Sequence, residues 1–287
     1  MSVPQITAIR VVCHDVASTA SFYMRAFGAQ PTAENGLTTL MLGEQRIELV
    51  ATGSESRIVA PSNSTAFQHC AIAVSDMAAA IKRLSTCPGW SAISCSGAEA
   101  LPKSSGGVIA FKFRDPEGHP LEFLQFPDDS VPTCWNDNKQ LFLGIDHSAI
   151  TIANTEKAAR FYANLGFSII KAQVNEGLEQ QRLDGVAAPS VEVTALEIPE
   201  AKPPHLELLH YRHPGTIAEV APATDIHSTR LILDMSGFEF SEGLFANYYL
   251  PEAERDSADV QETWLRDEDG HILILRGVVQ KVTRRDS

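Results

Sequence analysis

Histidine and glutamate side chains stand inside apolar runs of the chain, where they could bind a divalent cation. His147 lies in the run Ile145–Thr151, and Glu207 lies between leucines in Leu206–His210. An ionised glutamate among apolar neighbours is costly unless it is paired or bound to a cation. Imidazole and carboxylate groups together suit a hard or borderline divalent metal. A single histidine on a strand is nevertheless more often a hydrogen-bonded core residue than a ligand.

Two similar segments would supply strands to hold such ligands. Each begins as an apolar strand, turns at a polar pair and continues into a helix that carries Phe-Tyr. Asp15 and Asn154 are predicted to cap the helix starts, and a glycine follows each helix. A weaker copy has a helix starting near Asp76, and a fourth copy has a strand but a poor helix. The segments are Ile6–Ala29, Ile145–Phe167, Phe67–Leu84 and Asp225–Met235.

Further strand-like runs follow each opening segment, so the repeating unit is a strand, a helix and about three strands. Four units in tandem predict an architecture made of repeated modules. These runs are Thr38–Leu42, Arg46–Val50, Gly107–Phe113, Leu121–Phe126, Ser190–Ile198, His205–Tyr211, Glu262–Arg266 and Ile272–Arg276.

Two turn motifs complete a family resemblance. Asp115–Glu122 reads DPEGHPLE, and Asp267–Ile274 reads DEDGHILI. With the Phe-Tyr helices, they make the chain resemble the vicinal oxygen chelate superfamily of glyoxalases, extradiol dioxygenases and fosfomycin-resistance proteins. The resemblance implies an α+β fold of two domains, each with paired βαβββ modules forming a cupped mixed sheet around a cavity. We place the domains at 1–127 and 141–280, with a linker at 128–140 and a tail at 281–287.

The resemblance also implies metal ligands on the first and last strands of each module. In the second domain it selects His147, His227 and Glu207, and an aliphatic residue, Ile274, takes the fourth position. Two imidazoles and one carboxylate leave coordination positions open for a substrate with two neighbouring oxygen atoms.

The first domain offers an alternative metal or substrate site. It retains Glu48, His69 and Glu122, but Ala8 takes the remaining position and Arg10 follows on the same strand face. A guanidinium group disfavours a cation and favours an anion. The alternatives in this domain are therefore a metal site, an anion-binding pocket and a plain Arg–Glu ion pair.

The catalytic prediction centres on Glu207, which could leave the metal to take a proton from the substrate. Tyr248 and Tyr249 are candidates for cavity walls and proton donors, although ordinary packing is the commoner role of such aromatics. His119 and His271 lie in the turns before final strands, where we expect a role in folding.

The predicted function is a metal-dependent enzyme acting on a small molecule with adjacent oxygens, either a lyase or isomerase or a ring-cleaving dioxygenase. The metal would be Fe, Zn, Mn, Ni or Co. Ile274 weakens the dioxygenase hypothesis, because the resemblance places a ligand glutamate there. The alternative is a metal-free protein of the same fold that sequesters a small molecule.

Composition excludes other classes of function. Among 287 residues, 23 Lys and Arg oppose 36 Asp and Glu, a net charge of −13 that disfavours nucleic acid and membrane surfaces as partners. The five cysteines form no C-x-x-C motif, and a secretory signal, a glycine-rich phosphate loop and a G-x-S-x-G elbow are lacking. We therefore expect a cytoplasmic protein that is a monomer or homodimer.

Overall fold

The computed structural model describes residues 3–34, 37–53, 59–136, 139–227, 229–255 and 262–278. The predicted tail at 281–287 and residues 137–138 of the predicted linker lie outside these ranges. Among the described residues, no helix is long and apolar enough to cross a membrane.

The first half of the chain contains two modules that confirm the predicted order of elements. The first has β1 (Gln5–Cys13), α1 (Val16–Phe27), β2 (Gln30–Glu34), β3 (Leu37–Leu42) and β4 (Gln45–Ala51). The second has β5 (Gln68–Val74), α2 (Met77–Leu84), β6 (Ser91–Ala92), β7 (Glu99–Ala100), η1 (Lys103–Ser105), β8 (Ile109–Arg114) and β9 (Pro120–Gln125).

The second half contains the other two modules, and in the last of them short 3₁₀ segments stand where a helix would be. The third module has β10 (Phe142–Thr151), α3 (Thr155–Ala163), β11 (Ser168–Glu176), α4 (Gly177–Asp184), β12 (Ser190–Glu197) and β13 (His205–His213). The fourth has β14 (Arg230–Asp234), η2 (Glu242–Phe245), η3 (Glu252–Glu254), β15 (Glu262–Arg266) and β16 (Ile272–Arg276).

The helix starts follow the capping prediction. The side chains of Asp15, Asp76 and Asn154 each accept a hydrogen bond of 2.9 Å from a backbone N–H in the first turn of α1, α2 and α3. Such caps satisfy donors that the first helical turn leaves unpaired. The helices therefore begin where the sequence places short polar side chains.

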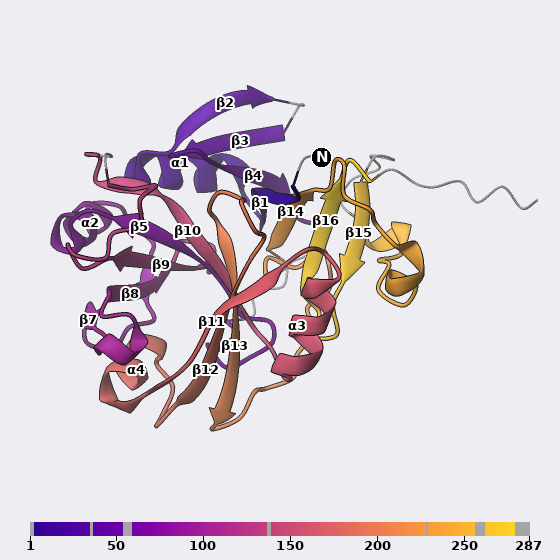
Figure 1. Ribbon diagram of the computed structural model, residues 1–287. Helices are drawn as coiled ribbons and strands as arrows, with labels where there is room; N and C mark the ends of the chain where they lie inside the picture. The colour runs from indigo at the N-terminus through magenta and orange to yellow at the C-terminus, as the bar shows by residue number, and fades with distance from the viewer. Residues whose placement is uncertain are drawn as a thin grey trace, which may run out of the picture.

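The strands form two mixed sheets, which confirms the α+β class of paired modules. Over the described residues, the seven-stranded sheet has the order β15-β16-β14-β1-β4-β3-β2, and the nine-stranded sheet has β11-β12-β13-β10-β5-β9-β8-β6 with β7 beside β8. The first module thus shares a sheet with the fourth, and the second shares one with the third (Figure 1). We name these the first–fourth sheet and the second–third sheet.

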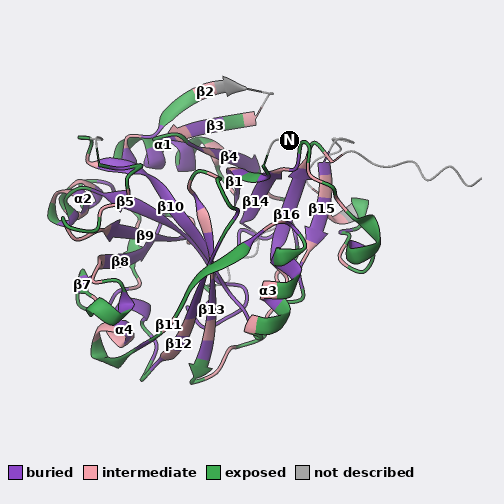
Figure 2. Cartoon of the chain, in the orientation of Figure 1, coloured by how far each residue is buried: buried purple, intermediate pink, exposed green. Residues whose placement is uncertain are grey.

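The partners in each sheet differ from our expectation that consecutive modules share a sheet. The antiparallel pairs β1·β14 and β5·β10 join modules that are not in the same half of the chain. Each half therefore contributes to both sheets. In Figure 2 the joining strands β5 and β10 are buried, whereas the edge strand β11 is largely exposed.

The DPEGH turn joins the first module to the second. Asp115 Oδ2 accepts a hydrogen bond of 3.1 Å from the Tyr23 hydroxyl and lies 2.7 Å from His119 Nδ1. His119 Nε2 donates to the carbonyl oxygen of Val12 at 2.8 Å. Gly118 permits this turn because its φ of +108° is in the region that favours glycine. We call the contact of this turn with Tyr23 of α1 and Val12 of β1 the first clasp.

An equivalent clasp joins the third module to the fourth. The Tyr162 hydroxyl donates to Asp267 Oδ2 at 2.9 Å, and His271 Nε2 donates to the carbonyl oxygen of Thr151 at 2.8 Å. In both clasps, the tyrosine of a Phe-Tyr helix thus binds the aspartate of a DPEGH or DEDGH turn. These bonds agree with the folding role expected for both turn histidines.

Candidate metal centre

The register of the second–third sheet places four potential ligands on one face. Ala71 of β5 pairs with Glu122 of β9, and Ala149 of β10 pairs with Glu207 of β13. His69 and His147 lie two residues before these alanines, so they share a face with the two glutamates. The second and third modules therefore each present one histidine on the first strand and one glutamate on the last strand.

These side chains meet inside the cup. His69 Nε2 lies 2.8 Å from Glu122 Oε2, and His147 Nε2 lies 3.6 Å from Glu207 Oε2. His69, Glu122 and His147 can each offer one ligand atom within 4.8 Å of the others. The two imidazole rings are 5.6 Å apart. His69, Glu122 and His147 are therefore placed to share one ion, with Glu207 beside His147.

The centre is buried at one end and open at the other. His69, Glu122 and His147 are 2%, 5% and 5% exposed, whereas the Glu207 side chain is 22% exposed. A small molecule would therefore approach from the Glu207 side.

Burial and neighbouring charges set the protonation of the inner pair. Burial lowers the pKa of His69, and the Lys112 ammonium lowers it further. Burial alone would raise the pKa of Glu122, but Lys112 and His69 outweigh it and the pKa is lowered. A neutral imidazole and an ionised carboxylate are the forms that bind metal.

Lys112 brings a positive charge close to this pair, and a carboxylate compensates it. Its Nζ lies 2.7 Å from Asp184 Oδ1 at the end of α4. The other oxygen of Asp184 accepts hydrogen bonds from Gln180 and Tyr211 at 2.7 and 2.8 Å. The ammonium therefore belongs to a neutral ion pair that ties β8 of the second module to α4 of the third.

The ring of His147 is oriented by the residue before it. A register shift between Ile145 and His147 marks a bulge in β10, and Asp146 Oδ2 lies 3.0 Å from His147 Nδ1. Burial would lower the pKa of His147, but Glu207 and Asp146 raise it to about 9. A carboxylate on Nδ1 turns Nε2 toward the other ligands, as in many metal sites.

The donors in the centre fit a divalent metal ion. Both nitrogens of His69 are buried and lack a hydrogen bond of good geometry among the described residues, although Nε2 is close to Glu122. Unsatisfied buried nitrogens are costly unless something else binds them. Two imidazoles and two carboxylates are a donor set suited to Zn, Ni, Co, Mn or Fe.

His227, predicted as a ligand, lies outside this centre. Its Nδ1 is 2.6 Å from Asp225 Oδ1, and Arg114 and His119 are its other charged neighbours. The resemblance assigns His227 to the position that His69 has in the first domain, on the first strand of its module. His227 precedes β14 and is not on it.

Register shows which residue of β14 takes the ligand position. Ile232 pairs with Ile274 as Ala71 pairs with Glu122, so the residue equivalent to His69 is Arg230. The same comparison confirms that Ala8 is equivalent to His147, because Arg10 pairs with Glu48.

The predicted alternative site is divided between the two sheets. His69 and Glu122 join the candidate metal centre, whereas Arg10 and Glu48 form an ion-pair cluster in the first–fourth sheet. Arg10 Nε donates to Glu48 at 3.0 Å and its Nη2 donates to Glu262 at 2.9 Å. Arg276 bridges the same two glutamates at 2.8 Å each. Guanidinium groups take the place of a metal cation beside Glu48, so of the three alternatives for this domain the structure has the Arg–Glu ion pair.

Tyr248 and Tyr249 lie in the fourth module and not among these ligands. Tyr248 packs against Phe161, with ring centroids 4.9 Å apart, and its hydroxyl donates to Glu268. Tyr249 is 39% exposed and forms an isolated bridge with Leu265. The placement gives neither tyrosine a contact with the centre, so the packing role is the one observed.

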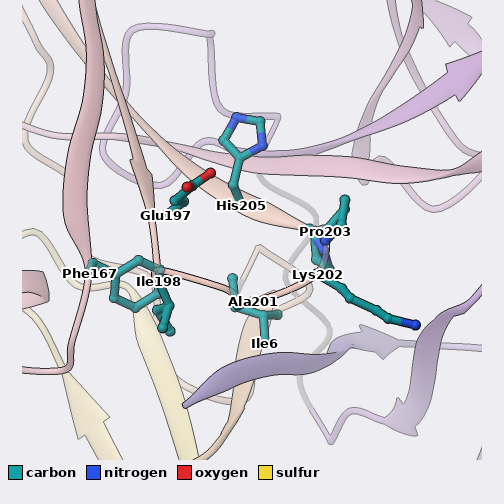
Figure 3. Close-up of a pocket in the computed structure, with 9 residues that line it drawn as sticks. Ile6, Phe167, Glu197, Ile198, Ala201, Lys202, Pro203 and His205 are labelled. Carbon is teal, nitrogen blue, oxygen red and sulfur yellow. The ribbon is translucent and has the colours of Figure 1, made fainter. Parts of the chain in front are cut away.

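A small pocket lies beside the open end of the centre. It has a volume of about 70 Å³, and Figure 3 shows His205 on one side of it with Phe167, Ile198 and Ala201 opposite. His205 Nε2 is 3.7 Å from Glu207 Oε1. The His205 side chain therefore lies between the pocket and the exposed carboxylate of Glu207.

Comparisons with known proteins give the same architecture. A profile of the Glyoxalase/Bleomycin resistance protein/Dioxygenase superfamily matches residues 5–123 and 144–275. Glyoxalase I from Zea mays superposes with a TM-score of 0.56 at 16% identity, over 95% of this chain and 92% of that one. A putative dioxygenase from Bacillus subtilis gives 0.52 at 14% identity, over 95% and 84%. No curated protein matches the sequence.

Proposed function

Because the chain belongs to the Glyoxalase/Bleomycin resistance protein/Dioxygenase superfamily, we propose that it is a metal-dependent isomerase or lyase acting on a small molecule with two adjacent oxygen atoms. The metal would be held by His69, Glu122, His147 and Glu207. The likeness of fold to glyoxalase I favours proton transfer as the reaction, with the substrate left open.

One observation carries the proposal: two modules contribute matching His and Glu residues to one buried centre. His69, Glu122 and His147 converge within 4.8 Å, and Glu207 lies 3.6 Å from His147. A bound divalent ion would polarise the substrate oxygens and acidify the neighbouring C–H bond.

The two glutamates have different surroundings, which suggests different roles. Glu122 is buried against His69 and close to Lys112, so it would stay in place. Glu207 is more exposed, and its nearest imidazole nitrogens lie at 3.6 and 3.7 Å. Its carboxylate would accept the proton from the substrate carbon and return it to the adjacent carbon.

The number of carboxylates favours proton transfer over ring-cleaving oxygenation. Non-haem iron oxygenases commonly use two histidines and one carboxylate. Here a second carboxylate is close enough to bind, and it supplies a base for a proton shift. Oxygenation remains the second outcome of the test below.

The test measures metal content first and reaction second. Protein purified without chelator should contain about one metal ion per chain by elemental analysis. Loaded separately with Zn, Ni, Co, Mn or Fe(II), it should catalyse exchange of the α-proton of hydroxy ketones in D₂O, followed by NMR. Oxygen consumption with a panel of catechols, without proton exchange, would instead identify a dioxygenase.

Matched variants locate the metal. We expect His69→Ala and His147→Ala to reduce the metal retained after purification at least tenfold, and His227→Ala and Glu48→Gln to leave it unchanged. Glu207→Gln should reduce the exchange rate at least a hundredfold while the folded protein retains part of its metal. Absence of metal, with binding of a small molecule intact, would overturn the enzyme proposal in favour of a sequestering protein.

A further inference from the structure

A second group of ligand atoms lies at the open end of the candidate metal centre. Asp146, His147 and His205 can each offer one atom within 4.8 Å of the others. His205 is opposite His147 in the β10–β13 register, and their rings are 5.3 Å apart. We call these three residues the mouth group, because His205 also lines the pocket of Figure 3.

The distances from His205 to the neighbouring carboxylates suit an ion better than direct hydrogen bonds. His205 Nδ1 is 3.9 Å from Asp146 Oδ2, and His205 Nε2 is 3.7 Å from Glu207 Oε1. Hydrogen bonds of these types are about 2.7–3.2 Å long. Two ligands at about 2.1 Å from one metal are about 3.0–3.4 Å apart, so a small inward movement of His205 would complete such a site.

Negative charge gathers around this opening. Asp146 and Glu207 flank the two imidazoles. Across the sheet, Leu196 pairs with Leu206, so Glu197 comes next to His205 on the neighbouring strand. In Figure 3 its carboxylate points to the side of the pocket where His205 lies. Carboxylates around two imidazoles attract a divalent cation.

We propose that the mouth group binds a second divalent cation, which shares His147 with the first. This inference rests on the proposed function. His147 Nε2 faces the inner ligands and Nδ1 faces Asp146. The second cation would bind Nδ1 of His147 in place of the proton on that nitrogen. The proton would pass to the solvent, so one proton is released for each second cation that binds.

The position of the second cation predicts its effect. It lies on the exposed side of Glu207, between the inner ligands and the pocket beside His205. A cation there would narrow the approach of substrate and hold Glu207 away from it. Excess metal should therefore inhibit an enzyme that the first equivalent activates.

Zinc binding tests the proposal with the whole protein. Equilibrium dialysis against Zn²⁺ should give two ions per chain for the wild type. The Asp146→Asn/His205→Ala variant should bind one, and the His69→Ala/Glu122→Gln variant should bind one at the mouth. His210→Ala is the matched control, because His210 also faces a carboxylate, Glu192, at 3.6 Å but elsewhere on β13. It should keep both ions.

The outcomes separate the two proposals. One ion in the wild type, lost in His69→Ala/Glu122→Gln, would overturn the mouth site and leave the proposed function intact. One ion lost only in Asp146→Asn/His205→Ala would support the mouth site and refute the inner centre. Two ions that survive the mouth substitutions would also contradict the proposal, and retention of one ion by each variant shows that it has folded.

Discussion

At the scale of single residues, the substitutions in the first–fourth sheet explain why one sheet is a candidate metal centre and the other is not. Ala8 and Ile274 stand where the second–third sheet has His147 and Glu122, and Arg10 forms ion pairs with Glu48 and Glu262. Trp264 lies beneath Arg10, 5.7 Å from its guanidinium carbon. An ion-pair cluster packed on Trp264 thus lies at the position that corresponds to the candidate metal centre of the other sheet.

The sequence located most of these positions, because an alternating strand pattern fixes the face of each residue. Ala8, Glu48, His69 and Glu122 were placed correctly by comparison of modules. His227 was misplaced because the fourth module lacks a Phe-Tyr helix from which its strand positions could be counted. Without such a helix, the sequence does not show which residue of β14 takes the ligand position.

Arg10→Met tests the structural role of the cluster. Arg10 is 1% exposed and compensates two buried glutamates, so removing it would leave carboxylate charge uncompensated. We expect the free energy of unfolding in urea to fall by about 3–5 kcal/mol, as for other broken buried pairs. The half-buried Arg276→Met should cost less. Loss of zinc from Arg10→Met at full folding would contradict the separation of the two sheets.

At the scale of elements, the module content was predictable and the pairing of modules was not. Caps, Phe-Tyr helices and alternating strands are local signals. Which strands lie side by side depends on contacts between distant segments, such as β1 with β14, for which the sequence has no local signal. A clue was present: the two lost ligand positions, Ala8 and Ile274, fall in one sheet only if the outer modules pair.

Asp115→Asn tests the first clasp. Asp115 Oδ1 accepts the backbone N–H groups of residues 117, 118 and 119, and Oδ2 accepts the Tyr23 hydroxyl. Because these are bonds to a buried charge, we expect a loss of about 2–3 kcal/mol in unfolding free energy at pH 7. Thermal and urea unfolding would measure it, with Asp76→Asn at an exposed helix cap as a mild control.

The pH dependence of that loss has a definite sign. Burial would raise the pKa of Asp115, but His119 and its hydrogen bonds lower it. The stabilisation is therefore complete above the ordinary carboxyl pKa of about 3.9 and is lost as the pH falls through the lowered value. Wild type and Asp115→Asn should converge in stability on acidification. A constant gap down to pH 3 would show that the carboxylate charge is not responsible.

At the scale of the whole molecule, the candidate centre depends on both halves of the chain. His69 and Glu122 come from the first half, and His147 and Glu207 come from the second. The proposed boundaries at 1–127 and 141–280 therefore separate sequence halves that share both sheets. Within each sheet, strand pairs join the two halves of the chain. Consecutive pairing of modules would instead have given each half a sheet of its own.

Separate expression of residues 1–127 and 141–280 tests this dependence. Each half alone would expose the unpaired edges of β1 and β5, or of β10 and β14, and each has only two of the four inner ligands, so we expect neither to form the inner zinc centre as a monomer. Mixed during refolding, they should form a one-to-one complex that binds metal, detected by size-exclusion chromatography and elemental analysis. An isolated monomeric half that binds as many zinc ions as the whole protein would contradict the shared centre.

The two clasps and two sheets connect the modules in a closed cycle: first to second, second to third, third to fourth and fourth to first. Gln5 at the start of β1 and Arg276 at the end of β16 both pair with Asp234 of β14, so these strand ends lie on either side of β14, about 10 Å apart. Every module thus contacts one neighbour through a clasp and the other through a sheet, and these contacts do not depend on which module comes first in the chain. A gene rearranged to begin at β5 and to join β16 to β1 through a short linker past β14 would encode the same contacts, so circular permutation should preserve the candidate metal centre.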